Sequence, residues 1–470
     1  MEQHHKMPSR AGLPSLNPTN SFWLSEPSHL SSHRTTPNLP SNSDVVVIGS
    51  GISGAFATHW LRQLSPQSSI TVLDAREVCS GATGRNGGHC APWVCGDDTL
   101  PHVAEFERRN LTFLRQLVLG RQIDCEWHDT RGVHAYFDAD TFKRAVRSVE
   151  NVQQQDPDIG ETLSCVQDGN VLHDIGLSPS TVGAVIDEQA ATLWPYKLIV
   201  RLFEDMLQDQ QMLHTERPNL NLQFNTPVTR LQQLPDETWM VHTSRGMLAT
   251  KQVLLATNAY TSYLVPEFTD LIVPVQGQMT SLIAPAQMKI FSGQRSYAFL
   301  GGGSDTCQKD EYLIQRSSRG NEAGRLLFGG GRRFAKQSGI GNSDDSQIHE
   351  RTSEFLRNEL NTVLDSGGDV LPLRPDFEWS GIMGFSRDGY PWVGEMPAQL
   401  GGGTGLYCCA GFTGHGMANA TLSALAVVKV MLGKEQTEID LPNEYRVSWE
   451  RVQRAKLLPY VTSIDIGAEM

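Results

Sequence analysis

The feature that most constrains this chain is a strand, a glycine-rich turn, a helix and a second strand in immediate succession. Residues 44–48 read Asp-Val-Val-Val-Ile, a run typical of a strand buried on both faces. The turn Gly49-Ser50-Gly51-Ile52-Ser53-Gly54 follows at once, and apolar residues then recur at helical spacing up to Leu64. A second strand is expected over residues 70–73, directly before Asp74. This order predicts a βαβ unit of a parallel sheet.

The three glycines of this turn have separate tasks in a dinucleotide-binding site. Gly49 permits the tight turn out of the strand, and Gly51 lets the backbone approach a pyrophosphate. Gly54 allows the helix to pack close to the sheet. The helix begins at Ile52 and Ser53, where free N–H groups and the positive end of the helix dipole favour phosphate.

The residues after the second strand extend this interpretation. A carboxylate at Asp74 is placed to accept hydrogen bonds from an adenosine ribose, and it disfavours a 2′-phosphate. Ala75 and Arg76 follow, and we include both among the expected cofactor-binding residues. The alternative is a structural glycine turn in an ordinary α/β protein. In that case the strand, turn, helix, second strand and acid would agree only by chance.

The bulk properties limit the remaining possibilities. The chain has 470 residues and 39% hydrophobic content, so we expect two domains. A net charge of −13 argues against a nucleic-acid partner. The eight cysteines form no CxxC pair and no Cys/His spacing typical of zinc, so no metal site is expected. With no signal-peptide pattern and no apolar run of membrane-spanning length, we expect a cytoplasmic protein without a membrane partner.

A second strand, glycine turn and helix are expected near the end of the chain. Residues 406–410 predict a buried strand, Gly411–Gly416 a glycine-rich turn, and residues 417–432 a helix rich in Ala and Val. Between the two ends the pattern is mixed. Helices are expected over 100–120, 141–155 and 196–207, and strands over 220–224, 228–231, 239–243, 247–248, 253–256, 296–299, 312–315 and 326–328.

A glycine- and hydroxyl-rich segment follows the first βαβ unit. It reads Ser80-Gly81-Ala82-Thr83-Gly84-Arg85-Asn86-Gly87-Gly88-His89. Here the sequence resembles the D-amino-acid-oxidase-type family of FAD-dependent oxidoreductases, most closely its γ-glutamylputrescine oxidase-like branch, in which such a segment lies beside the flavin. The resemblance implies FAD as cofactor, and it implies contacts from Ser80, Gly81, Ala82, Thr83, Arg85, Asn86, Gly87 and Gly88.

Further segments resemble motifs of the same family in the same order. They are Thr226-Pro227-Val228, Leu254–Tyr260, Trp379-Ser380-Gly381, Asp388–Gly394 and Gly411–Met417. The resemblance extends from about residue 40 to 435. The additional cofactor contacts that it implies are Val228, Thr257, Asn258, Ala259, Gly411, Phe412, Thr413, Gly414, His415, Gly416 and Met417.

Two positions depart from relatives within the family. Sarcosine-oxidase relatives attach FAD through a cysteine where this chain has Gly381, so non-covalent FAD is expected. Glycine-oxidase-type relatives clamp the substrate carboxylate with an arginine where this chain has Met383. Because a bidentate clamp needs a guanidinium, a simple α-amino acid held in that way is not expected. Arg316, Arg332 or Arg333 remain as alternatives from another strand.

The candidate catalytic residues are His415 and His89. Backbone N–H groups of the 411–416 turn can stabilise the negative charge that a reduced flavin carries, and His415 can add a hydrogen bond or a charge. Packing under the flavin ring is its alternative role. Arg85 is expected either to counter a pyrophosphate or to hold its loop. Further pocket candidates are His89, Cys90, Trp93, Trp379 and Phe412, with core packing as the alternative for the two tryptophans.

We therefore expect an α/β fold with a Rossmann-type FAD-binding domain and a substrate domain built on an antiparallel sheet. The expected division is an arm over 1–40, the FAD-binding domain over 41–95, 187–270 and 375–440, the substrate domain over 96–186 and 271–374, and a tail over 441–470. The resemblance implies an amine oxidase with a small-molecule amine and O2 as partners. A flavin dehydrogenase that passes electrons to a carrier or quinone, and a non-catalytic flavoprotein acting in binding or assembly, are the alternatives.

Overall fold

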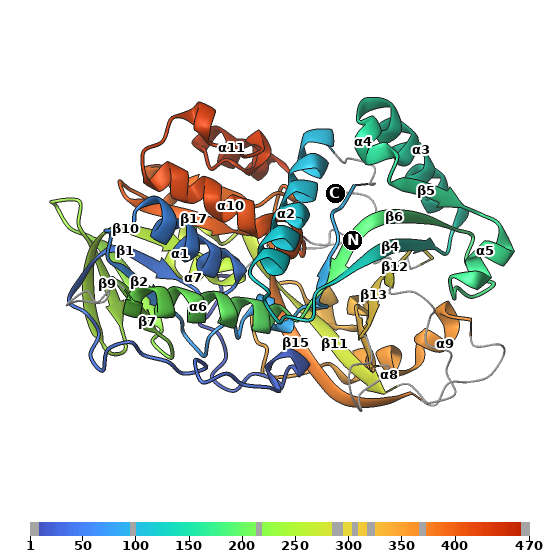
Figure 1. Ribbon diagram of the computed structural model, residues 1–470, viewed down its shortest axis with the longest axis horizontal. Coiled ribbons are helices and arrows are strands. Elements are labelled where there is room, and N and C mark those ends of the chain that lie inside the picture. Colours follow the sequence, from blue (N-terminus) through green and yellow to red (C-terminus); the bar gives the residue numbers. More distant parts are fainter. Residues whose placement is uncertain are drawn as a thin grey trace, which may run out of the picture.

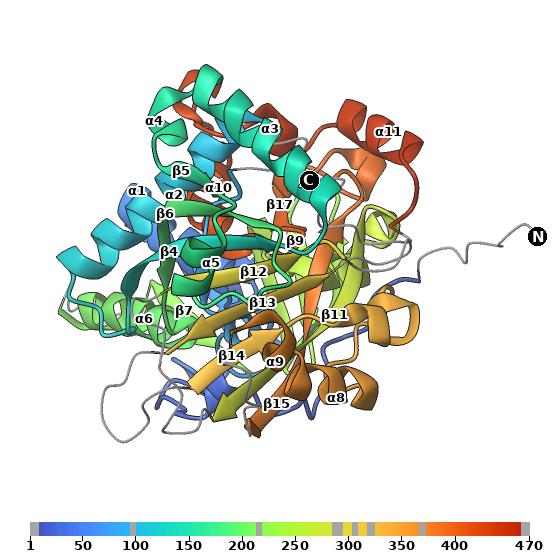
Figure 2. The ribbon, with the colours of Figure 1, turned by 90° about the vertical axis from the view of Figure 1, so that its right-hand side faces the viewer.

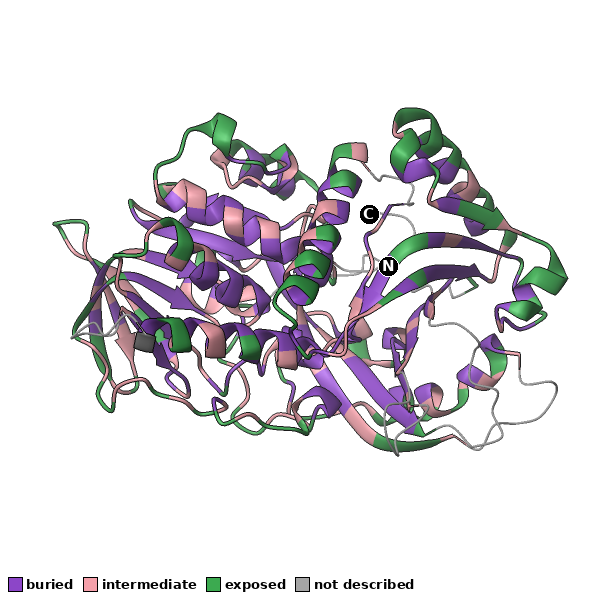
Figure 3. Cartoon of the chain, viewed as in Figure 1, coloured by how far each residue is buried: buried purple, intermediate pink, exposed green. Residues whose placement is uncertain are grey.

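The computed structural model describes residues 9–94, 100–212, 219–283, 295–302, 309–316, 325–365 and 373–461. Two β-sheets organise these residues, one in each half of the molecule (Figure 1). The strands of both sheets are largely buried, whereas several covering helices expose one face to solvent (Figure 3). This mixed α/β architecture agrees with the fold expected from the sequence.

The first sheet contains the predicted βαβ unit. Its strand order is β16-β17-β10-β1-β2-β7, and β8 and β9 extend it from β10. The strands β10, β1, β2 and β7 run parallel. The bounds are β1 (Asn42–Ile48), β2 (Ile70–Leu73), β7 (Leu220–Gln223), β8 (Val228–Gln233), β9 (Trp239–Thr243), β10 (Gly246–Leu255), β16 (Trp392–Glu395) and β17 (Leu406–Ala410).

Helices cover this sheet, and one of them continues each glycine turn. The helices are α1 (Ile52–Leu64), α2 (Pro101–Gly120), α6 (Pro195–Met212), α10 (Gly416–Met431) and α11 (Trp449–Leu457). α1 packs against α10, and α10 packs against α2 (Figure 1). The two strand–turn–helix units predicted far apart in the sequence are therefore neighbours in the fold.

The second sheet has the order β15-β11-β14-β13-β12-β4-β6-β3, with β5 beside β6. Most of its pairs are antiparallel, while β12 and β4 run parallel. The bounds are β3 (His89–Cys90), β4 (His128–Tyr136), β5 (Leu163–Val166), β6 (Gly183–Thr192), β11 (Ile272–Ile283), β12 (Arg295–Leu300), β13 (Asp310–Gln315), β14 (Arg325–Gly329) and β15 (Arg374–Ser386).

The remaining helices lie at the outer side of this second sheet. They are α3 (Ala139–Gln155), α4 (Pro157–Gly160), α5 (Gly169–Asp174), α8 (Glu350–Asn358) and α9 (Leu360–Val363), and α7 (Thr261–Leu264) precedes β11. Figure 2 shows the strands of this sheet with α8 and α9 beside them. The expected domain boundaries stay a prediction. No described helix is long and apolar enough to cross a membrane.

One strand is continuous where two were expected, and other strands were not predicted. Residues 247–248 and 253–256 were expected as separate strands, but β10 continues through Thr250, Lys251 and Gln252 because that stretch pairs with β1 and β9. β11 and β15, the two longest strands, were not predicted. Both include residues with weak strand preference, such as Pro274 and Gly277, so their sequence pattern is interrupted.

The N-terminal arm is described from residue 9 onward, and its early part is drawn in dark blue in Figure 1. Most of its side chains are exposed or half-buried. Phe22, Trp23 and Leu24 form a short 3-10 helix, and the first two are buried. The ring of Trp23 lies 5.6 Å from that of Trp194, centroid to centroid. Further along the arm, Thr35 donates a backbone hydrogen bond to Leu222 of β7. The apolar cluster of residues 22–24 therefore fixes the arm to the body.

Candidate functional site

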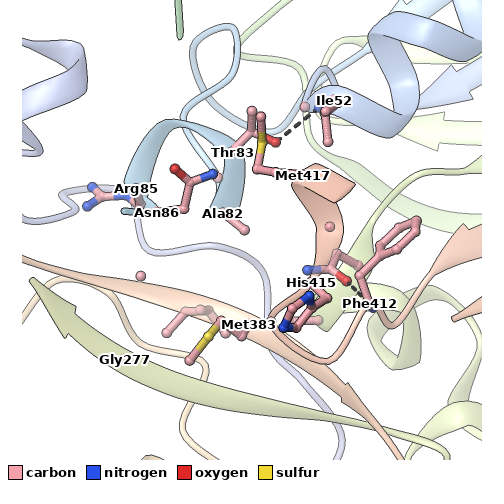
Figure 4. A pocket seen from close by; sticks show the side chains of 18 of the residues that line it. Ile52, Ala82, Thr83, Arg85, Asn86, Gly277, Met383, Phe412, His415 and Met417 are labelled. Atoms are coloured by element: carbon pink, nitrogen blue, oxygen red, sulfur yellow. Dashed lines mark hydrogen bonds between the residues drawn. The ribbon is translucent and has the colours of Figure 1, made fainter. Parts of the chain in front are cut away.

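A cavity of about 390 Å³ runs between the two sheets. At one end it is lined by the β1–α1 turn, the 80–87 loop and the strand ends around residues 226–228. At the other end it is lined by β11, β12 and β13 of the second sheet and by the 412–417 turn. Figure 4 shows residues from these segments around the same space. A ligand in this cavity would touch both halves of the fold.

The β1–α1 turn has the backbone geometry that the glycine pattern requires. Gly49 has φ +114°, in the region that favours glycine. A Cβ at Gly54 would lie 1.8 Å from the carbonyl oxygen of Gly49, so only glycine permits this close approach of α1. Gly51 is the N-cap of α1 and lines the cavity. The N–H of Ile52 donates to Oγ1 of Thr83 at 3.0 Å, which joins the helix to the neighbouring loop (Figure 4).

Asp74 lies at the carboxyl end of β2 on the cavity wall. Its Oδ2 accepts hydrogen bonds from the N–H and the hydroxyl of Ser50, at 2.8 and 2.6 Å, and its Oδ1 accepts one from the N–H of Arg76 at 3.1 Å. Burial raises the pKa of the Asp74 carboxyl, although these hydrogen bonds act in the opposite direction. A carboxyl group has further acceptor sites, so Asp74 can also accept a ribose hydroxyl.

Arg76 and Arg85 hold the cradle together from behind. The two terminal nitrogens of Arg76 each donate to Asp345 at 2.9 Å. The guanidinium of Arg85 donates to the carbonyl oxygens of Thr19 at 2.6 Å and Ser380 at 2.8 Å. Of the two roles considered for Arg85, these contacts favour holding the loop over countering a pyrophosphate. In Figure 4 its guanidinium points away from His415 and Met383.

The second glycine turn presents only part of its backbone to the cavity. The N–H groups of Gly411 and Phe412 donate to Oδ1 of Asn258, at 3.0 and 3.4 Å, so these two are not free for a flavin. Gly414 has φ +85°, and a Cβ there would meet nothing nearer than Sδ of Met383 at 3.9 Å. Its backbone therefore lies at an open part of the cavity. His415 is the N-cap of α10, whose first amides follow directly.

Three histidines line the second-sheet half of the cavity, namely His89, His134 and His415. Burial lowers the pKa of His89 to about 3 and the pKa of His134 and His415 to about 4. All three imidazoles are therefore uncharged at neutral pH. For His415 this leaves a hydrogen bond, not a charge, as the contribution toward a flavin. The indole of Trp93 stacks on the ring of His134, with the ring centroids 5.1 Å apart. It meets the ring of His415 edge-on, with the centroids 5.5 Å apart.

Glu107 of α2 lies behind these groups. Its carboxylate accepts hydrogen bonds from the N–H of Trp93 at 2.5 Å and from the amide of Asn419 at 2.7 Å, and it lies 3.9 Å from Nδ1 of His415. Burial raises its pKa from 4.5 to about 7. Glu107 is thus a buried carboxyl that changes protonation state near neutral pH.

This pKa predicts a pH-dependent stability that Glu107→Gln removes. Between pH 4.5 and 7 the folded protein keeps a proton that the unfolded chain releases, so raising the pH through this range lowers the free energy of unfolding. The loss due to Glu107 is on the order of 3 kcal/mol. In urea unfolding, the free energy of unfolding of Glu107→Gln minus that of wild type should increase by about this much as the pH rises from 4.5 to 7. Glu105→Gln, an exposed change on the same helix, is the control, and parallel pH curves for all three proteins would contradict the assignment.

The structure brings most of the predicted site residues to one cavity. Those that line it are Gly49, Gly51, Ile52, Ser53, Asp74, Ala75, Arg76, Ser80, Gly81, Ala82, Thr83, Arg85, Asn86, Gly87, His89, Val228, Thr257, Asn258, Ala259, Phe412, Thr413, Gly414, His415, Gly416 and Met417.

Three predicted cofactor residues lie outside this lining. Gly54 packs α1 on the sheet, as the fingerprint requires. A Cβ at Gly88 would lie 2.7 Å from the ring of Trp23, and a Cβ at Gly411 would lie 3.0 Å from Ile272, so both glycines face packed side chains.

Of the further pocket candidates, some line the cavity and others are packed in the core. Trp93 and Phe412 line the cavity, together with His89. Trp379 is fully buried and donates to the carbonyl oxygen of Arg85 at 2.8 Å, so it belongs to the core. Cys90 is buried beside the carbonyl oxygen of Met417 and does not line the cavity. Its thiol and the five other described cysteines are free.

Sequence reasoning missed the residues that the second sheet contributes to the cavity. These are His134, Ser296, Asp310, Glu311 and Tyr312, from β4, β12 and β13. Each stands in a strand without a local motif, so only the pairing of distant strands brings them together. Only Asp310 and Glu311 among these could have been suspected from the sequence. Two adjacent acids beside an apolar strand need charged or hydrogen-bonding partners when they are buried.

The first-sheet end of the cavity fits FAD. The Gly51 N-cap offers a helix N-terminus for the pyrophosphate, and Asp74 stands at the ribose position of a dinucleotide fold. A Cβ at Gly81 would meet no atom within 4 Å, so the 80–87 loop leaves room for a ligand. At the other end of the cavity, the space beside the Gly414 backbone lets a ligand approach that backbone closely.

Comparison with known proteins agrees with this geometry. The chain is 20% identical over 411 residues to γ-glutamylputrescine oxidoreductase of Escherichia coli K12, and this alignment covers 85% of each of the two chains. Glycine oxidase of Geobacillus kaustophilus has the same fold, with a TM-score of 0.66 at 19% identity over 84% of this chain and 96% of that one. L-proline dehydrogenase of P. horikoshii has a TM-score of 0.65 at 17% identity over 87% and 97%. The family model described as FAD dependent oxidoreductase (DAO) matches residues 44–430, so the chain belongs to this family and is an FAD-binding oxidoreductase.

Proposed function

We propose that this protein oxidises a small amine or an amino-acid-derived amine and uses O2 as the final electron acceptor. The observation that carries the proposal is the pairing, in one cavity, of an FAD cradle with three uncharged imidazoles and the indole of Trp93. Names of similar proteins point the same way, since one is a γ-glutamylputrescine oxidoreductase and another a glycine oxidase. The cytoplasm remains the proposed location.

Bound FAD would accept a hydride from the substrate C–H bond next to nitrogen and pass both electrons to O2, giving H2O2, while water hydrolyses the imine product to a carbonyl compound. We propose that the FAD is held without a covalent bond, because Gly381 offers no nucleophile where a cysteine would be needed. A Cβ at Gly381 would also lie 3.0 Å from Cβ of Arg85, which leaves little room for a longer side chain.

The chain's own contribution is to bind the amine in its neutral form. Only an amine with a free nitrogen lone pair can release a hydride readily, so the cavity has to disfavour an ammonium group. Nδ1 of His89 is hydrogen-bonded to the hydroxyl of Ser296, and Nε2 is buried with no hydrogen-bond partner among the described residues. With Nδ1 donating, Nε2 carries a lone pair that can accept a hydrogen bond from the neutral amine.

Aromatic side chains complete the substrate end. Trp93, Phe412 and Tyr312 line it, and burial raises the pKa of the Tyr312 hydroxyl beyond the range in which it ionises. Such a hydride transfer would require no obligatory protein base. The residues therefore bind the substrate, keep its nitrogen uncharged and exclude water from the reacting carbon.

Anaerobic mixing of the FAD-loaded protein with a panel of amines tests this function directly. We expect the 450 nm flavin absorbance to bleach with at least one primary or secondary amine and to be unaffected by lactate or glycolate. Admission of O2 should then restore the colour with one H2O2 formed per flavin. Restoration by a quinone or an electron carrier but not by O2 would identify a dehydrogenase instead, and a flavin that no substrate reduces would indicate a non-catalytic flavoprotein.

A further inference from the structure

Part of the cavity wall is supplied by the N-terminal arm, through Gly12, Leu13 and Pro14. The arm precedes the whole βαβ unit, so the dinucleotide fingerprint does not include these residues. The carbonyl oxygen of Ser15, the next residue, accepts a hydrogen bond from Nη1 of Arg76 at 3.2 Å. Because Arg76 closely follows the acid at the expected ribose position, the arm reaches the cavity at the adenosine end of the FAD site.

The arm is attached to α7 directly before these three residues. Nε of Arg10 donates to the carbonyl oxygen of Ser262 at 3.0 Å, and its Nη2 donates to the carbonyl oxygen of Tyr263. The N–H of Ala11 donates to Oγ of Ser262 at 3.0 Å, and the Ala11 side chain is buried. Tyr263 itself lines the cavity, so this attachment lies at the edge of the cofactor site.

A second attachment follows the three residues. Oγ of Ser15 donates to Oδ1 of Asp344 at 2.7 Å. The N–H of Thr19 donates to the carbonyl oxygen of Asp345 at 2.8 Å, and the Asp345 carboxylate is the one that both terminal nitrogens of Arg76 contact. We call residues 10–15 the strap, since this segment is held at both ends and its middle residues line the cavity.

The middle of the strap brings apolar side chains to this end of the cavity. Leu13 is 38% exposed although it lines the cavity, so the protein alone does not bury it. Apolar residues at the ends of the first-sheet strands line the same region, namely Ile48, Leu73 and Val228. The faces of an adenine ring are largely apolar, so contact with such side chains stabilises bound adenosine.

We propose that the strap closes the adenosine end of the FAD site, and that FAD enters and leaves only when the strap detaches from α7. Leu13 and Pro14 supply apolar contacts to the adenosine, and Arg10 is a positioning residue that holds the strap in place. Most hydrogen bonds of the strap are at least partly exposed, so its local detachment costs much less than global unfolding. This proposal requires bound FAD only, so failure of the amine panel would leave it intact.

The rates of FAD exchange test the proposal with two variants. Quenching of flavin fluorescence on mixing FAD with apoprotein gives the association rate, and its recovery after dilution gives the dissociation rate. Leu13→Ala removes a contact but keeps both attachments, so dissociation should be about 5- to 10-fold faster with unchanged association. Arg10→Met removes the attachment to α7 and increases the fraction of open apoprotein, so both rates should rise, by about 10-fold.

Each variant has a matched control in the same arm. Leu16→Ala changes the same residue type three positions further on, where the leucine is 87% exposed and lies outside the cavity lining. Arg34→Met removes the same charge, and Arg34 also donates to two carbonyl oxygens, those of Phe224 and Asn225, which lie outside the lining as well. Both controls should exchange FAD at wild-type rates.

Hydrogen exchange of the wild-type apoprotein tests the position of the strap. Binding of FAD, and of ADP as a probe without the flavin, should slow exchange of the backbone amides in residues 10–16. FMN, which lacks the adenosine, should leave these amides unchanged. Slowing by FMN but not by ADP would place the strap at the flavin end and overturn the assignment.

Wild-type exchange rates in both strap variants would overturn the whole proposal. If Leu13→Ala releases FAD faster but Arg10→Met associates at the wild-type rate, the strap is a fixed wall, and the claim that it must detach is wrong. Faster exchange in the two controls, to the same extent as in the strap variants, would also contradict it, because the effect would then belong to the arm as a whole.

Discussion

Gly51→Val should abolish FAD binding in a protein that still folds. Gly51 has φ −71° and ψ −171°, a conformation open to any residue, so the substitution causes no backbone strain. Space is the limiting factor. A Cβ at this position would lie 3.0 Å from Oγ1 of Thr83, and the two methyl groups of valine would extend into the cavity at the N-terminus of α1. The pyrophosphate needs that space and those backbone amides.

The expected effect is a rise in the FAD dissociation constant of about 100-fold or more, which corresponds to roughly 2.7 kcal/mol. Equilibrium dialysis or fluorescence titration of the apoprotein measures it, and far-UV circular dichroism checks that the fold is kept. Gly120→Val is a matched control, since Gly120 ends α2, is exposed, and a Cβ there would meet no atom within 4 Å. Stoichiometric FAD in a folded Gly51→Val variant would refute this position for the pyrophosphate.

The first-sheet half of this site could be predicted because its information is local. The turn Gly49–Gly54 carries its backbone requirements in consecutive residues, and Asp74 follows from the strand that it ends. The Gly411–Met417 segment likewise has a strand on one side and a helix on the other, and both were predicted within one or two residues. Chemistry and secondary structure agreed in each segment, which is why few alternatives remained.

The second-sheet half could not be predicted in the same way. His134, Ser296 and Tyr312 come from three strands that are adjacent only after β12 pairs with β4 and with β13. β11 and β15 both line the cavity, and glycine and glutamine at Gly277, Gln278 and Gly381 interrupt the alternation of apolar and polar residues that identifies a strand. Their function as a cavity wall is thus the physical reason that they were missed.

Arg332 and the N-terminal arm show two further limits. The sequence named Arg332 beside Arg316 and Arg333, but nothing local distinguishes the three, because ion-pair partners and burial depend on the tertiary fold. The arm has no periodic pattern, yet Ser21 donates its hydroxyl hydrogen to the carbonyl oxygen of Gly84 at 2.7 Å. Its order comes from contacts with the 80–88 loop and not from its own secondary structure.

Those contacts lead to a second large effect, expected for Trp23→Ala. Trp23 is fully buried in the arm, its indole N–H donates to the carbonyl oxygen of Asn86, and its own carbonyl oxygen accepts from Trp194 at 2.7 Å. Gly88 fits against its ring, because a Cβ there would lie 2.7 Å from the indole. Loss of this side chain should lower the free energy of unfolding by about 3–5 kcal/mol. It should also release the loop that lines the FAD site.

The two consequences can be separated with Trp239→Ala. Trp239 lies in β9, is also buried, and donates to the carbonyl oxygen of Thr404 at 2.9 Å, away from the cavity lining. Both variants should unfold at lower urea concentration, but only Trp23→Ala should raise the FAD dissociation constant, by roughly 10-fold or more. Trp23→Phe, which keeps most of the packing but loses the hydrogen bond to Asn86, should fall between wild type and alanine.

Equal FAD affinity in the Trp23→Ala and Trp239→Ala variants would mean that the arm only stabilises the fold. A selective loss of FAD would mean that the arm is part of the cofactor site, whose cavity Gly12, Leu13 and Pro14 of the arm also line. The physical basis is preorganisation. The 80–87 loop can offer its backbone to FAD only while Trp23, Ser21 and the Thr19–Arg85 hydrogen bond hold it in place, so the cost of ordering the loop is met during folding and not on binding.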